Sequence, residues 1–337
     1  MAVARKTRLD VRYNGKNLPG QLKKYIEEFT YTDVASGESD SIDFTVNNRD
    51  LRFIGRNMPK KGDAVTVYIR RMNWNRSKDT RAFKCGKFVI DDISFSGPVN
   101  QGKISAVSIP VKEEFKSTRR SKTYKNITVE QLARGITKKA GIALHYSAKK
   151  IRIREIEQSK EPDSELLLSV CSEYGLGIKI YSGKVVIYDE EEYEKRKPVK
   201  SFNRTGGEIV DWDWNTTMQG TYTGAKVRYT DPSDNKEHKF TIGKKGRMLD
   251  VDVSAYSKKD AALKAKAKLA AQNKERTTMT LTVFPNKNLV ATNTIQLNGF
   301  RKLSGKYYID SVTHTVSGTG GYSQVLNLHK VSKRIGL

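Results

Sequence analysis

The chain has 337 residues, room for two or three domains with substantial cores, and no run of about 18 apolar residues that could span a membrane. Its formal charge is +25, from 62 basic and 37 acidic residues spread along the chain, and such an excess indicates a polyanionic or acidic neighbour. The N-terminus lacks the apolar core of a secretion signal, and the two cysteines, Cys85 and Cys171, are expected to be buried free thiols.

The first third of the chain is predicted to be all-β. Turn residues such as Asn14-Gly15 and Gly97-Pro98 separate six alternating segments that are typical of short antiparallel strands. These segments are Leu9–Tyr13, Tyr25–Thr32, Ser41–Val46, Ala64–Arg70, Gly86–Ser94 and Gly102–Ile109. We therefore expect a first β-barrel domain over residues 1–116.

A basic segment between the fourth and fifth of these strands is expected to be a long loop. Trp74 in its middle is unusual for a purely solvated excursion, although solvation remains the alternative, and aromatics among cations also fit a nucleic-acid surface loosely. The candidate partner interface consists of Arg70, Arg71, Trp74, Arg76, Lys78, Arg81 and Lys84.

The pattern changes after the first barrel, and residues 117–200 are predicted to form a small α+β domain. Lys116–Lys125 is interpreted as a basic linker into this domain. Cap signals predict one helix between Thr128 and Gly141, and apolar spacing predicts a second over Ser164–Tyr174. A short strand and a hairpin are expected at Ile142–Tyr146, Ile178–Tyr181 and Val185–Tyr188. The acidic run Asp189–Glu194 is expected to be a solvated helix end.

Residues 201–337 are predicted to form a second β-barrel domain with one helix. The helix is expected over residues 257–275, where Ser257 and Asp260 form a capping box and the many lysines predict a solvated cationic face. The strands expected before the final hairpin are Asp211–Trp214, Ala225–Thr230, Glu237–Ile242, Thr277–Phe284 and Thr294–Leu297.

One stretch occurs twice. Gly86–Ser94 (GKFVIDDIS) reappears as Gly305–Thr313 (GKYYIDSVT), an offset of 305 − 86 = 219 residues, and the same offset aligns Gly102–Ile109 with Gly321–Leu328. The repeated structural motif consists of Gly86, Phe88, Ile90, Asp91, Gly305, Tyr307, Ile309 and Asp310. We interpret it as a duplicated β unit, the alternative being chance recurrence of amphipathic hairpins. The predicted fold class is therefore mainly β, with two similar antiparallel β-barrel domains flanking an α+β domain.

No set of residues predicts catalysis or a bound cofactor. The four histidines lack metal-site spacing, and Gly97–Ile104 resembles a phosphate loop but has Ile104 where a magnesium-binding hydroxyl is needed and no helix to follow. Strand alternation predicts that Asp91 and Asp92 point to opposite faces, which disfavours a paired carboxylate site. We expect no catalytic, cofactor-binding or metal-binding residues.

The order of these segments resembles a known family, the late control protein D group of phage tail baseplate hub proteins. The matching residues are Gly37–Phe44, Met58–Asp63, Gly86–Ile93, Tyr124–Val129, Ser164–Gly175 and Gly305–His314. The chain is also similar to the hub part of type VI secretion spike proteins. The resemblance covers nearly the full length, and its specificity lies in the order and spacing of the pieces.

The resemblance implies a homotrimer whose two barrels per subunit form a pseudo-sixfold ring between a hexameric tail tube and a trimeric spike. The implied partners are the tail tube protein, the central spike protein, the tape-measure protein and other baseplate proteins, with DNA only in transit and no membrane insertion. The implied location is the baseplate of a virion or tail-like particle, such as a bacteriocin, assembled in the host bacterial cytoplasm.

Two other classes of function remain open at this stage. A tail-associated cell-wall hydrolase would need an acid or thiol pair in an appended domain, which we do not expect because the chain ends soon after its last predicted strand. A basic nucleic-acid-binding protein would show salt-dependent affinity for duplex DNA. The cationic excess itself could line a channel, complement acidic partners at the rims of a ring, or be neutral, and we favour the rims because a basic channel would retain DNA.

Overall fold

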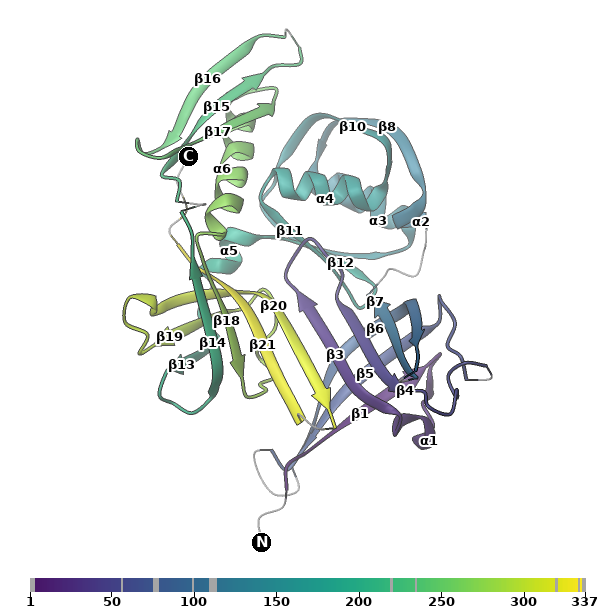
Figure 1. Ribbon diagram of the computed structural model, residues 1–337. Helices are drawn as coiled ribbons and strands as arrows, with labels where there is room; N and C mark the ends of the chain where they lie inside the picture. Colours follow the sequence, from purple (N-terminus) through teal and green to yellow (C-terminus); the bar gives the residue numbers. More distant parts are fainter. Residues whose placement is uncertain are drawn as a thin grey trace.

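The computed structural model describes residues 4–55, 57–74, 79–98, 100–108, 114–218, 221–233, 235–318, 321–332 and 334 (Figure 1). The protein is mainly β, and its largest sheet contains 13 strands, most of them antiparallel. Most strands of both predicted barrels join this one sheet, and no closed barrel forms in the described parts of the chain. The prediction of two separate barrels is wrong in this respect, because strand alternation reports which face is buried and not which edges pair.

The first β unit contains all six strands expected in this part of the chain. Its elements are β1 (Lys6–Tyr13), β2 (Lys16–Asn17), α1 (Gly20–Lys23), β3 (Ile26–Val34), β4 (Ser41–Asn47), β5 (Ala64–Met72), β6 (Thr80–Ser96) and β7 (Gln101–Val107). They pair in the order β2-β1-β5-β6-β7-β4-β3. Their alternate side chains, among them Phe29, Tyr31 and Phe88, are fully buried in one core.

The second β unit repeats this arrangement. Its elements are β13 (Lys200–Asn203), β14 (Ile209–Thr216), β18 (Thr277–Val283), β19 (Thr294–Asn298), η1 (Arg301–Leu303), β20 (Gly305–Ser317) and β21 (Gly321–Lys330). The order β13-β19-β20-β21-β18-β14 matches β1-β5-β6-β7-β4-β3 strand for strand. One direction differs, because β13 runs parallel to β19 whereas β1 runs antiparallel to β5.

Local irregularities also occur at equivalent places in β6 and β20. Gly86 and Gly305 have φ angles of +140° and +144°, a region that only glycine adopts readily. The register then shifts just after Ile90 in β6 and just after Ile309 in β20, which marks a β-bulge in each strand. The repeated stretch therefore forms the same bent strand in both units.

The equivalence extends to β3 and β14. The register shifts just after Ile26 in β3, against β4, and just after Ile209 in β14, against β18. Counting from these bulges, Trp212 and Trp214 of β14 occupy the places of Phe29 and Tyr31 of β3.

The predicted single offset for both strands of the hairpin is wrong by three residues. Ile90 pairs with Ala106 and Ile309 pairs with Leu328, so β7 and β21 are related by 328 − 106 = 222 residues. The cause is the greater length of the second hairpin, whose strands continue further beyond the bulge. The offsets of 219 and 222 residues both place glycine or small residues near the turn, so the sequence alone did not distinguish the two alignments.

The two units meet edge to edge within the chain. Beyond its bulge, β20 leaves β19 and pairs with β3, so that Ser311–Ser317 lie opposite Glu28–Val34. Figure 1 shows this junction, where yellow β20 lies beside purple β3. This pairing makes the two units one continuous sheet.

The middle region has its own core, which includes Phe115 and Leu132. Its elements are α2 (Glu114–Ser117), β8 (Arg119–Thr128), α3 (Val129–Ala140), β9 (Ala143–Ser147), β10 (Arg152–Pro162), α4 (Asp163–Glu173), β11 (Leu176–Tyr181), β12 (Lys184–Asp189) and α5 (Glu190–Lys195). Both expected helices and the hairpin are present. The expected basic linker is instead strand β8, paired with β10, because ion pairs such as Lys125–Glu155 (3.4 Å) compensate its cations.

In chain order, the segment between β14 and β18 forms a further small sheet. Strands β15 (Gly224–Thr230), β16 (Glu237–Gly243) and β17 (Met248–Ser254) pack against helix α6 (Lys258–Lys274) around a separate core. The prediction that the strands near 225–242 belong to the second barrel is therefore wrong. The helix itself was predicted to within one residue at each end, because Ser257 caps the N–H of Asp260 as expected.

Both cysteines are buried free thiols, as expected. Burial raises the pKa of the Cys171 thiol to about 12, and it also raises that of Cys85. No helix in the described ranges is both long and apolar enough to cross a membrane.

The bend glycines give a first testable prediction. Gly86→Ala and Gly305→Ala should each lower the free energy of unfolding by about 1–3 kcal/mol, because the bent strand needs a φ that alanine resists. The matched control is Gly135→Ala in α3, where an added Cβ meets nothing within 4 Å and should raise stability by about 0.5–1 kcal/mol. Urea unfolding measures the stability of all three variants. Wild-type stability in both Gly86→Ala and Gly305→Ala would contradict the claim that the bent strand requires glycine at these positions.

Candidate functional site

The sheet presents a largely polar surface on the side away from the cores, interrupted by Val325 between Thr282 and Thr313 and by Val107 opposite Ser41. It is formed by the outward side chains of β14, β18, β21, β20, β3, β4, β7 and the end of β6, and we call it the polar sheet face. Its members include Asp211, Asp213, Thr280, Thr282, Asn327, Ser311, Thr313, Thr315, Glu28, Thr30, Thr32, Asp43, Thr45, Lys103, Ser105, Asp92 and Ser94. Residues directly opposite each other on paired strands share a face, so these side chains form rows across the sheet.

Cations are scarce on this face although the chain carries an excess of them. Among the residues named, Lys103 is the one cation, and it lies 3.2 Å from Asp43, which also accepts a 2.5 Å hydrogen bond from Ser105. Asp92, Asp211 and Asp213 are exposed. Because polyanions bind through lysine and arginine, a surface of hydroxyl groups and carboxylates offers them little affinity.

The predicted basic loop is mostly strand. Strand β5 continues to Met72 and β6 begins at Thr80, so the connection is short. Arg70 forms an ion pair with Asp10 (2.6 Å), Arg81 contacts Asp79 (3.1 Å) and Lys84 is exposed. Arg76 and Lys78 lie outside the described residues.

Two members of the proposed interface contact the second β unit of the same chain. The buried Arg71 guanidinium donates a 2.8 Å hydrogen bond to the carbonyl oxygen of Pro285. The Trp74 ring packs edge-on against Tyr322 at 5.9 Å, and its indole N–H donates to the Lys6 carbonyl oxygen at 3.2 Å. Sequence reasoning singled out Trp74 as a partner contact and gave no indication that its neighbour Tyr322 lies in the same chain.

The aspartates of the repeated motif have different roles. Asp91 and Asp92 are both exposed, and the bulge after Ile90 interrupts the regular alternation on which the prediction of opposite faces was based. Asp310 lies at the equivalent bulge, and its carboxylate is 2.8 Å from His329 Nδ1. In the described parts of the chain, no three histidine, cysteine, aspartate or glutamate side chains are grouped to hold a metal ion.

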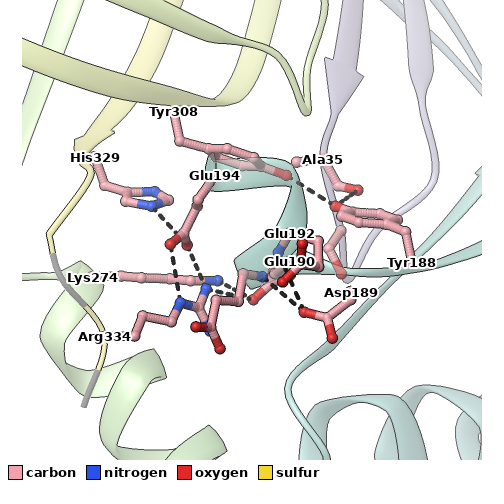
Figure 2. A network of polar contacts seen from close by, with 12 residues as sticks. Ala35, Tyr188, Asp189, Glu190, Glu192, Glu194, Lys274, Tyr308, His329 and Arg334 are labelled. Atoms are coloured by element: carbon pink, nitrogen blue, oxygen red, sulfur yellow. Dashed lines mark hydrogen bonds and ion pairs between the residues drawn. The ribbon is translucent and has the colours of Figure 1, made fainter. Parts of the chain in front are cut away.

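A buried polar network around α5 joins three parts of the molecule (Figure 2). Tyr188 of the middle region donates to the Ala35 carbonyl oxygen after β3 at 2.8 Å, and its hydroxyl lies 3.2 Å from that of Tyr308 in β20. On the far side of α5, Glu194 contacts both Arg334 and His329. The network therefore fixes the middle region against both β units.

The acidic run at α5 is paired, and the prediction of a solvated helix end is wrong. Glu194 is only 5% exposed, Glu190 binds Lys274 (2.5 Å) and Glu191 binds Lys266 (2.9 Å). The lysines come from α6, whose predicted solvated face is therefore also partly buried. The two helices are complementary in charge, a tertiary relation that neither segment reveals alone.

The pKa values of this cluster follow from its burial and pairing. Burial alone would lower the pKa of His329, but the charges of Asp310 and Glu194 outweigh it and raise that pKa to about 9. Burial would raise the pKa of Glu194, but His329 and Arg334 lower it to about 2. The pair is therefore charged at neutral pH.

A second buried ionic cluster joins the middle region to the first β unit. Lys179 of β11 binds Asp33 and lies 3.1 Å from Asp40, and both carboxylates are almost completely buried. Burial raises the pKa of Asp40 to about 7, against the opposing charge of Lys179, and the two carboxylates hold the pKa of Lys179 above its usual value. One lysine thus compensates two buried acids.

Comparison with known proteins gives two curated relatives. No protein-family model matches the sequence. The chain is 23% identical over 269 residues to the "Probable baseplate hub protein" of Escherichia phage 186 and 24% identical over 235 residues to that of Escherichia phage P2. These matches span 78% and 66% of this chain, and 67% and 56% of the two relatives. The resemblance predicted from the sequence is confirmed.

Solved structures share the fold. The tail protein from Neisseria meningitidis MC58 superposes with a TM-score of 0.73 at 15% identity, covering 96% of this chain and 97% of that one. The E. coli c3393 protein, a type VI secretion component described as structurally similar to the T4 tail proteins gp27 and gp5, superposes with a TM-score of 0.58 at 14% identity. That match covers 97% of this chain and 78% of the other.

Proposed function

We propose that the protein is a structural hub of a phage or phage-like tail baseplate, with no enzymatic role. The observation that carries the proposal is the repeated six-stranded unit, joined edge to edge within one chain. The similarity to two baseplate hub proteins supports the same conclusion. In this function the protein acts through its contacts with other subunits.

The repeat suits an adaptor between two symmetries. Three copies of a chain with two equivalent β units present six similar surfaces on one side and retain threefold symmetry on the other. Such a ring can bind a hexameric tail tube and a trimeric spike, and the middle region would contact other baseplate proteins. We propose domain boundaries near residues 116 and 200, with Phe115, just before the first boundary, already packed in the core of the middle region.

The polar sheet face is proposed to line the channel of this ring. Its hydroxyl groups and carboxylates would let DNA or a tape-measure protein pass without being retained. Exposed cations on β6, such as Lys84, would contact acidic partners at the rim.

Locating the chain in assembled particles tests the proposal. Tail particles would be purified from cells that produce the chain with an N-terminal epitope tag, and labelled with gold-conjugated antibody for electron microscopy. We expect label at one end of the tail tube. Label along the tube, or a particle fraction without the chain, would overturn the proposal, and a clear zone in a cell-wall zymogram of the purified protein would favour the hydrolase alternative.

A further inference from the structure

The junction inside the chain shows how one β unit binds another. The end of β20 adds to the outer edge of β3 through seven opposed residue pairs, from Ser311 with Val34 to Ser317 with Glu28. His314 stands directly opposite Tyr31, with ring centroids 5.4 Å apart. The second unit therefore offers a strand edge beyond its bulge, and the first unit accepts it on β3.

The first unit has the same strand edge, but none of the described residues pairs with it. Strand β5 pairs with β6 only as far as Val89, and beyond the bulge Asp92–Ser96 pair with β7 alone among the described residues. The edge of this segment that faces away from β7 is equivalent to the edge of β20 that pairs with β3. Free backbone N–H and C=O groups along a strand edge are a template for another strand.

The second unit has the matching acceptor strand, and its outer edge is also without a partner strand among the described residues. In the part of the chain that the structure describes, β14 pairs only with β18 and ends the sheet. Trp212 is 43% exposed and Val210 is 61% exposed, whereas Phe29, at the place in β3 that corresponds to Trp212, is fully buried. Strand β14 therefore lacks the cover that β20 gives to β3.

We propose that residues 92–96 of β6 in one subunit pair antiparallel with β14 of a second copy of this chain. Transferring the register of the internal junction places Ile93 opposite Thr216, Ser94 opposite Asn215 and Phe95 opposite Trp214. The inference rests on the proposed hub function and specifies its subunit contact.

The side chains suit this register. On the core side, Phe95 would face Trp214 as His314 faces Tyr31, and aromatic pairs across strands stabilise a sheet. On the polar side, Ser94 would face Asn215 as Thr313 faces Thr32, so the polar sheet face continues across the contact.

The contact is head-to-tail, because the two edges lie at opposite ends of the eight-strand path from β14 to β6. Repeating a head-to-tail contact produces either a closed ring or an open filament. Closure after three subunits would leave no free edge along the channel.

Engineered disulfides test the register. Ser94→Cys and Asn215→Cys, made in separate tagged proteins, mixed and oxidised with diamide, should yield a covalent heterodimer, because directly opposite Cα atoms lie about 4.5–5.5 Å apart. The double variant should yield a covalent trimer as its largest product. The matched control pairs Ser94→Cys with Asp211→Cys, on the same face of β14, and the parent protein with its two buried thiols gives the background.

The outcomes separate this inference from the proposed function. A trimer by native mass spectrometry that forms no 94–215 disulfide, or forms the 94–211 disulfide equally well, would overturn the β6–β14 pairing. The trimeric ring of the proposed function would still stand. A covalent ladder beyond the trimer would support the pairing and overturn the closed ring. A chain that stays monomeric and uncrosslinked would overturn both.

Discussion

Replacing Lys179 by methionine should lower the free energy of unfolding by about 3–5 kcal/mol, since it leaves two buried carboxylates facing each other without a cation. Asp33 is 3% and Asp40 is 0% exposed, so water cannot take over the role of the lysine. Thermal and urea unfolding of both proteins at pH 8 measures the loss.

The same cluster offers an internal control and a pH signature. The triple variant Asp33→Asn, Asp40→Asn, Lys179→Met buries no charge and should recover most of the lost stability. In Lys179→Met alone, burial raises the pKa of Asp40 with no lysine charge to oppose it. The folded state then binds more protons than the unfolded one, and stability should fall as pH rises above about 4. A single variant as stable as wild type at pH 8 would show that the cluster contributes nothing.

Stability of the wild-type protein should fall by up to about 3 kcal/mol between pH 6.5 and 9, owing to His329. Its folded pKa is raised from 6.5 to about 9, so the stabilisation is fully present below pH 6.5 and is lost as pH rises through 9. Glu194, with its pKa lowered to about 2, stays charged throughout this window. Unfolding curves across these pH values measure the slope.

His329→Gln should remove most of this slope, because glutamine carries no proton to lose. His238→Gln is the matched control, since His238 is exposed and stacks on Tyr229 away from the α5 network. A decline that persists undiminished in His329→Gln would assign the pH dependence to other groups.

Features with local signals were predictable from the sequence. Helix α3 is capped at its N-terminus by Thr128, which exchanges hydrogen bonds with Gln131, and at its C-terminus by Gly141 in the left-handed conformation. The duplication was visible because the bend glycine and bulge of β6 and β20 need particular residues at fixed spacing.

Features that depend on distant partners were not predictable. The partner of Arg71 is a carbonyl 214 residues away, and the partners of the α6 lysines lie in the acidic run before β13. Strand β8 was mistaken for a linker because its charges are compensated across the pair with β10. The alternation of residues within a strand does not show which strand pairs at its edge, so the joining of the two expected barrels into one sheet could not be predicted.

The mass of the purified full-length protein under native conditions tests the central claim most directly. Two equivalent β units per chain, each with one strand edge unpaired among the described residues, predict a closed assembly of about 114 kDa, three times the 38.1 kDa of the chain. A dimer, or a series of ever larger assemblies, would contradict a threefold ring built from six equivalent units.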